Sequence, residues 1–145
     1  MAVNYFGTLR MIRAFAPVLK ANGGGTIVNM LSILARVNLP IMATLCASKA
    51  AAFSLTQATR AELAGQGTTV IGMMPGAVET RMTAHLTIPK MQPADVAAAV
   101  TAAVEAGTED VYPGDMAQGV SGGLAHDPKA VEKDFAGSVA APGAG

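Results

Sequence analysis

Two side chains that could hold or move a proton, Ser32 and Lys49, lie in the first half of the chain. Ser32 follows a short apolar stretch, and Lys49 lies 17 residues later in an alanine-rich segment. Leu45 precedes Lys49 by four residues, about one helical turn, and a leucine has no ionisable or hydrogen-bonding group. Taken singly, Ser32 would be an ordinary serine at a strand end and Lys49 a solvated lysine on a helix. Their order and spacing make them candidates for one shared site.

Helical and strand patterns alternate around these residues. Apolar residues recur every three or four positions in the helical segments, and β-branched residues cluster in the strands. This alternation produces βαβ crossovers, so we predict an α/β fold with a short parallel sheet of about three strands between helices. The predicted order is helix 2–21, strand 26–31, helix 42–64, strand 68–73, helix 93–106 and strand 110–112.

Composition limits the classes of function. The charges of ten basic and ten acidic residues cancel, and the sequence has no cluster of Lys and Arg that could bind along a phosphate backbone. We therefore expect no nucleic acid as a partner. Arg10 and Arg13 interrupt the apolar N-terminal stretch, and no run approaches the ~20 apolar residues of a membrane span. Cys46 is the single cysteine, which excludes an internal disulfide. We therefore expect a cytoplasmic protein that is not in a membrane and has no metal site.

The length of 145 residues suits one domain. We place that domain at residues 1–135, with a short terminal helix beginning after Asp127 and Pro128. Residues 136–145 are small and rich in proline and glycine, so we predict a disordered tail there.

Four short motifs occur in a fixed order. They are VNYFG at Val3–Gly7, GTIVNMLS at Gly25–Ser32, MATLCASKAA at Met42–Ala51 and PGAVET at Pro75–Thr80. Together they closely resemble the second half of the short-chain dehydrogenase/reductase family. In that family a catalytic tyrosine stands at the position of Leu45, and a catalytic serine precedes it by thirteen residues, where Ser32 lies. The resemblance extends less sharply over residues 2–136.

The resemblance implies NAD(P)-dependent oxidation or reduction of an alcohol or carbonyl in a small-molecule substrate, on a partial Rossmann-like three-layer fold. It assigns a substrate flap to residues 79–91, whose composition does not reveal the substrate. The catalytic residues that it implies are Asn4, Ser32 and Lys49, with Leu45 at the tyrosine position. The cofactor-binding residues that it implies are Lys49, Pro75, Gly76, Val78 and Thr80.

Two departures from the family pattern predict impaired activity. Leu45 cannot donate a proton, and Gly23–Gly25 precede a strand instead of linking a strand to a helix, so they are not a pyrophosphate-binding turn. We therefore expect the chain to lack the N-terminal nucleotide-binding half of the fold. The residues that select NAD or NADP belong to that half, so this choice cannot be read from the sequence.

Two alternative functions remain open at this point. One is a non-catalytic half-fold that forms a homo-oligomer, either through the two long helices or through an exposed sheet edge at the strand ending at Leu31. The other is a truncated gene product whose upstream half carries the nucleotide site.

Overall fold

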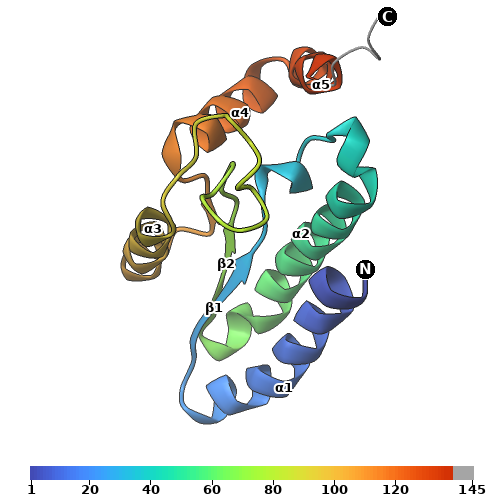
Figure 1. Cartoon of the computed structure of the whole chain (residues 1–145). Coiled ribbons are helices and arrows are strands. Elements are labelled where there is room, and N and C mark those ends of the chain that lie inside the picture. The colour runs from blue at the N-terminus through green and yellow to red at the C-terminus, as the bar shows by residue number, and fades with distance from the viewer. Residues whose placement is uncertain (139–145) are drawn as a thin grey trace, which may run out of the picture.

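Three parallel strands form the centre of the fold in the computed structural model, which describes residues 1–138 (Figure 1). The strands are β1 (Gly25–Met30), β2 (Thr68–Met73) and β3 (Asp110–Val111), and they lie in this order across the sheet. Gly25 pairs with Thr68 and Met30 with Met73, so β1 and β2 are in register along their full length. Among the described residues β1 pairs with β2 alone, which confirms the predicted open edge.

Helices cover both faces of the sheet, so the predicted three-layer α/β fold is confirmed (Figure 1). On one face α2 packs on β2, and α1 packs on β1 beside α2; on the other face α3 packs on β2. Within the described part of the chain, no helix combines the length and the apolar character that crossing a membrane requires. The helices are α1 (Thr8–Ala21), α2 (Ala43–Leu63), α3 (Pro93–Ala106), α4 (Gly114–His126) and α5 (Pro128–Gly137).

The core is centred on β2. Val70, Ile71 and Met73 have no exposed surface, because β2 lies between two other strands and between two helix layers. Ile71 and Met73 pack with Ala103 of α3. Beyond the ends of the strands, a second cluster joins α4 and α5 to the segment that follows β1; it contains Ile33, Val37, Ala117, Val120 and Val131.

The structure differs from the sequence predictions at three places. The first turns of the N-terminal helix form a separate π-helix, η1 (Ala2–Gly7), in which Phe6 N donates to Met1 O at 3.2 Å. Helix α4 was not predicted, because its several glycines obscure the apolar spacing of Ala117 and Val120. The predicted disordered tail begins too early, since Ala136 and Gly137 belong to α5. The remainder of that prediction, residues 139–145, lies outside the described residues.

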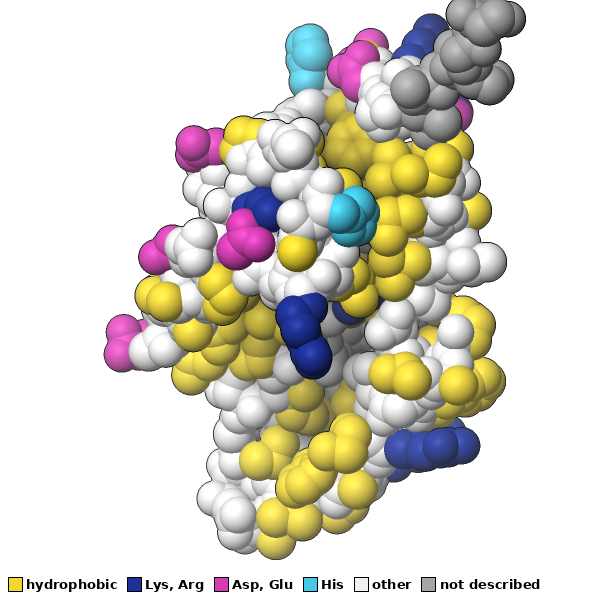
Figure 2. Space-filling view, viewed as in Figure 1, with side chains coloured by type: hydrophobic (Ala, Val, Ile, Leu, Met, Phe, Trp, Pro, Cys, Tyr) yellow, Lys and Arg dark blue, Asp and Glu magenta, His cyan; other side chains and the backbone are white. Residues whose placement is uncertain are grey.

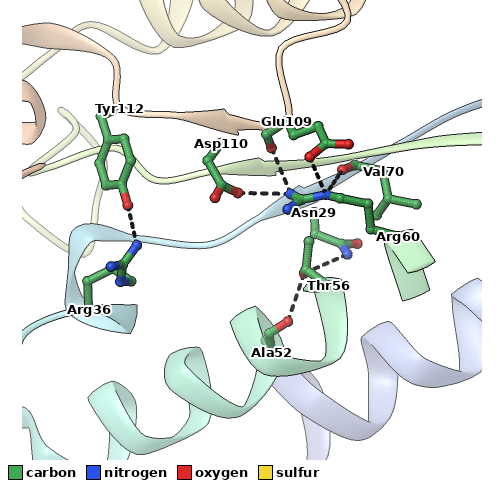
Figure 3. A network of polar contacts seen from close by, with 9 residues as sticks. All are labelled: Asn29, Arg36, Ala52, Thr56, Arg60, Val70, Glu109, Asp110 and Tyr112. Carbon is green, nitrogen blue, oxygen red and sulfur yellow. Dashed lines mark hydrogen bonds and ion pairs between the residues drawn. The ribbon is translucent and has the colours of Figure 1, made fainter. Parts of the chain in front are cut away.

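A polar network centred on Arg60 joins α2 to the sheet (Figure 3). The Arg60 guanidinium donates to Val70 O at 3.0 Å, to Glu109 O at 3.0 Å and to Asp110 Oδ1 at 2.8 Å. Because β3 is only two residues long and pairs with Gly72 and Met73, Arg60 takes the place of a strand neighbour for the Val70 carbonyl.

Candidate functional site

The carboxyl ends of β1 and β2 meet at one edge of the sheet, and the candidate residues Ser32 and Pro75 follow directly. Leu31 N donates to Met73 O at 2.8 Å, and Ile33 N donates to Pro75 O at 3.0 Å. The segment that carries Ser32 therefore runs beside the Pro75 turn. In parallel α/β sheets ligands bind outside the carboxyl ends of the strands, so this edge is the place to look for a site.

Lys49 reaches the same edge from α2. Its Nζ donates to Met30 O at 2.9 Å, two residues before Ser32, and this bond leaves two further N–H donors on the ammonium group. Burial lowers the pKa of Lys49 below its usual value. The structure therefore brings together Ser32 and Lys49, which the sequence could relate only by spacing.

Ser32 also has a structural role at this edge. Its Oγ accepts a hydrogen bond from Leu34 N at 3.1 Å and so caps the one-turn 3₁₀ helix Ile33–Ala35. Among residues 1–138 the Ser32 hydroxyl makes no other hydrogen bond, so its O–H remains available to a ligand oxygen. Capping of this turn by Ser32 is thus compatible with a role in the site.

Asn4 docks η1 against the turn of α2 that precedes Lys49. Its Nδ2 donates to Ser48 Oγ at 3.0 Å, and Ser48 Oγ donates to Leu45 O at 2.7 Å. Ser48 is only 2% exposed, although the sequence analysis did not single it out. Its position next to Lys49, three residues after Leu45, is the only signal that could have indicated it. The pair fixes the helical turn that carries both Leu45 and Lys49.

The Pro75–Gly76 turn packs tightly against α4. A Cβ on Gly76 would lie 2.6 Å from Met116 Sδ, and the N–H of Ala77 donates to the same sulfur at 3.4 Å. Only glycine therefore fits this close approach of turn and helix without a shift of the methionine. Met116 was not predicted, because α4 itself was missed.

The flap that follows is tied together at its base. Val78 forms an isolated parallel bridge with Met91, and the Glu79 carboxylate pairs with Lys90 Nζ at 2.7 Å. Thr80 lies further out and is exposed, with its N–H donating to Thr83 Oγ1 at 3.1 Å. Of the residues that the resemblance assigns to cofactor binding, Pro75 and Gly76 lie at the strand end, whereas Thr80 lies on the flap.

Both tyrosines make contacts elsewhere, so neither is a substitute for the acid that is absent at Leu45. The Tyr112 hydroxyl accepts a hydrogen bond from Arg36 at 2.7 Å (Figure 3), and burial is the main cause that raises the pKa of Tyr112. A phenol with a raised pKa is a weaker acid near neutral pH. Tyr5 packs edge to face on Phe6, with ring centroids 5.0 Å apart.

Comparison with known proteins identifies the family. The family model described as short chain dehydrogenase matches residues 1–90, which is more than half of the chain. This chain belongs to the short-chain dehydrogenase family. A short chain dehydrogenase from Burkholderia cenocepacia J2315, whose crystal structure contains NADP, is 51% identical and superposes with a TM-score of 0.87. That match covers 92% of this chain and 56% of the other.

Curated short-chain dehydrogenases match a smaller part of the chain. Galactitol 2-dehydrogenase (L-tagatose-forming) of Cereibacter sphaeroides is 45% identical over 85 residues, which are 57% of this chain and 34% of that protein. Inactive 2-(S)-hydroxypropyl-CoM dehydrogenase 2 of Xanthobacter autotrophicus is 41% identical over 78 residues, 54% of this chain and 34% of that protein. The chain thus aligns with about a third of these curated relatives and about half of the solved one. The predicted family and fold are confirmed.

Proposed function

We propose that this chain carries part of an NAD(P)-linked oxidoreductase site for an alcohol or carbonyl substrate, and that proton transfer at this site is impaired by Leu45. The observation that carries the proposal is the position of the Lys49 ammonium group. It is bonded to the carbonyl of Met30, directly before the strand end where Ser32 and the Pro75–Gly76 turn meet.

Reduction of a carbonyl needs a hydride on carbon and a proton on oxygen, and NAD(P)H supplies the hydride when it is bound. The Ser32 hydroxyl can donate a hydrogen bond to the substrate oxygen from the strand end. A general acid contributes roughly 10² to 10⁴ in rate, and Leu45 contributes no proton. Substrate can therefore be oriented at this site, while protonation of its oxygen falls to water.

The described residues fit one end of a nicotinamide cofactor. Lys49 has two N–H donors left for the hydroxyls of a ribose, and Gly76 follows Pro75, whose carbonyl accepts from Ile33 N next to Ser32. No described segment offers a glycine-rich turn between a strand and a helix for the pyrophosphate, because β1 leads into the helix capped by Ser32. Cofactor binding by this chain therefore depends on the ribose and nicotinamide contacts, and we expect it to be weak.

Leu45→Tyr tests the proposal. Titration of NADH and NADPH fluorescence against the wild-type chain and the variant measures binding first, and carbonyl reduction is then followed at saturating cofactor over a panel of simple ketones. We expect Leu45→Tyr to reduce a ketone at least about 100-fold faster than wild type does, because the tyrosine restores the acid.

Leu45→Phe is the matched control, since it adds the ring without the hydroxyl. Equal rates for the tyrosine and phenylalanine variants with cofactor bound would refute the assignment of Leu45. The absence of binding at millimolar cofactor would refute the cofactor site.

Association is a second candidate function, favoured by the apolar surface around η1 and the start of α2. Val3 is 81% exposed and Ile41 is 74% exposed, on segments that adjoin the two long helices. We propose that the chain forms a homo-oligomer through α1 and α2. Sedimentation velocity should show an oligomer that Val3→Ser together with Ile41→Ser converts to monomer. A monomeric wild-type chain at high micromolar concentration would exclude it.

A further inference from the structure

The thioether sulfur of Met116 is a direct contact between α4 and the Pro75–Gly76 turn. Its Sδ accepts the N–H of Ala77 at 3.4 Å and lies against Gly76, where an added Cβ would be only 2.6 Å away. A thioether is a weak hydrogen-bond acceptor, yet among residues 1–138 the N–H of Ala77 has no other acceptor. One sulfur atom therefore holds the main chain of this turn against α4.

A second methionine holds the other side of the same turn. The N–H of Met91, at the base of the flap, donates to Ala77 O at 2.9 Å. The Met91 sulfur in turn lies close to α4, since a Cβ on Gly114 would be 3.3 Å from it. Both main-chain groups of Ala77 are thus bonded, the C=O by the flap and the N–H by the Met116 sulfur. Loss of the bond to sulfur would free the turn from α4 and leave it tied to the flap.

A cavity of about 340 Å³ lies beside these contacts, and its lining includes Gly76, Ala77, Met91 and Met116. This volume holds several molecules of the size of water, each of which takes about 30 Å³. The Met116 side chain is 37% exposed, whereas Met73 and Met74 have no exposed surface. In Figure 2, hydrophobic side chains reach the surface in the upper half of the molecule, where α4 and the flap lie in Figure 1. A small oxidant can therefore reach Met116 in the folded chain.

We propose that Met116 is a site of reversible oxidation by hydrogen peroxide, and that its oxidation releases the Pro75–Gly76 turn from α4. In the reaction a lone pair of Sδ attacks one peroxide oxygen, so the S–O bond forms as the O–O bond breaks. The departing hydroxide takes the proton of the transferred oxygen and becomes water. The sulfur loses two electrons, the peroxide is reduced to water, and the product is methionine sulfoxide.

Release of the turn follows from the change at sulfur. The thioether uses its lone pairs to accept the N–H of Ala77, whereas a sulfoxide sulfur carries a positive partial charge and no longer attracts an N–H group. The side chain also changes from apolar to polar, which favours its movement into the cavity. Methionine sulfoxide reductases restore the thioether, so the change is reversible. The inference does not depend on the proposed oxidoreductase function, although it concerns a turn that this function uses.

The oxidation site is tested by treating the full chain with millimolar hydrogen peroxide and following each methionine by tandem mass spectrometry of its peptides. We expect Met116 to gain one oxygen at least about tenfold faster than Met73 and Met74, because oxidation follows exposure. Met82, which is 71% exposed on the flap, gives the rate of an accessible methionine. Met116 that stays reduced as long as Met73 and Met74 would overturn the proposal.

Gly76→Ala tests the contact between the sulfur and the turn. The backbone of Gly76 does not have a positive φ, so alanine is allowed there and only the contact with the methionine changes. The added methyl group should push the Met116 side chain into the cavity and make its oxidation severalfold faster, with the rate at Met82 unchanged. An unchanged rate at Met116 in a folded Gly76→Ala variant would contradict the contact.

Release of the turn is measured by hydrogen exchange of the Ala77 amide, followed by NMR. Oxidation should make this exchange at least about threefold faster, because the amide loses its acceptor, and a methionine sulfoxide reductase should reverse the effect. Met116→Leu should exchange as fast as the oxidised wild type before peroxide is added, whereas Met91→Leu should respond to peroxide as wild type does. Exchange that stays constant or slows when Met116 is oxidised would overturn the proposal, and so would loss of the response in Met91→Leu.

Discussion

The chemistry of this site depends on one turn of α2, in which Leu45, Ser48 and Lys49 have separate tasks. Lys49 points to the strand end, where its Nζ bonds Met30 O. Ser48 points to the N-terminal helix and receives the Asn4 amide. Leu45, one helical turn before Lys49, has no group that could donate a proton. In the proposed function, this turn is the framework of a proton-transfer site at which Leu45 stands in the place of the acid.

Ser48→Ala should lower the free energy of unfolding by about 1 kcal/mol, because the half-buried Asn4 amide loses its acceptor. Urea denaturation followed by circular dichroism measures the change. Ser54→Ala is the control, since Ser54 is exposed on the same helix. If both variants lose the same stability, the effect comes from helix propensity and not from the contact with Asn4.

The partly buried ammonium group of Lys49 should make stability depend on pH. Burial lowers the pKa of Lys49 in the folded chain, whereas an unfolded lysine titrates near about 10.4. Between these two values the unfolded chain binds more protons, so stability rises with pH there. The free energy of unfolding of wild type minus that of Lys49→Met should therefore increase as the pH passes the lowered pKa, and level off above about pH 11. Urea titrations of both proteins from pH 7 to 11 test this. A difference that stays constant or falls over that range would refute the lowered pKa.

At the scale of elements, capping and packing decide where the helices begin and end. Helix α5 begins at Pro128, and the carboxylate of Asp127 accepts hydrogen bonds from Lys129 N and Ala130 N, each at 3.0 Å. Val131 then packs against α4 in the same cluster as Val120. The sequence signal of Asp127 and Pro128 was therefore sufficient to predict this helix, although not its last residues.

Asp127→Ala should destabilise the chain by about 1 kcal/mol through loss of this N-cap. The change is read from the midpoint of urea denaturation. Asp134→Ala, at an exposed position of the same helix, is the matched control and should change stability by less than about 0.5 kcal/mol. A neutral Asp127→Ala would mean that α5 is held by its packing alone.

At the scale of the whole molecule, Arg60 links the α2 layer to two strands (Figure 3). Its side chain is 18% exposed and bonds the main chain of both β2 and the segment entering β3. This contact matters because β3 is short and gives β2 few ladder bonds on that side. The Arg60 guanidinium therefore provides a hydrogen bond to the main chain of β2 that a longer β3 would otherwise provide.

Arg60→Gln should lower the free energy of unfolding by about 2 kcal/mol, since it removes charge-assisted bonds and leaves the Val70 and Glu109 carbonyls without them. Arg13→Gln, at an exposed position of α1, should have an effect within about 0.5 kcal/mol. The two variants are compared by urea denaturation at low and high salt. A loss for Arg60→Gln as small as that of the control would mean that the network is dispensable.

The sequence by itself determined the alternation of helices and strands, the parallel sheet and the family. These properties depend on local periodicity and on short motifs such as Gly25–Ser32 and Met42–Ala51, and both are formed by residues that are close together in the sequence. It also predicted the open edge of β1 and the order of the candidate residues. It failed for α4, where glycines hide an apolar face that only the cluster around Ile33 uses.

Tertiary structure alone decided which side chains meet. The contact between Asn4 and Ser48 spans 44 residues, that between Lys49 and Met30 spans 19, and that between Arg36 and Tyr112 spans 76. No local pattern encodes such pairs, because they arise when the helices settle on the sheet at distances set by packing. The same packing brings the Met116 sulfur onto the Pro75–Gly76 turn, a contact between two segments that neither segment's sequence contains.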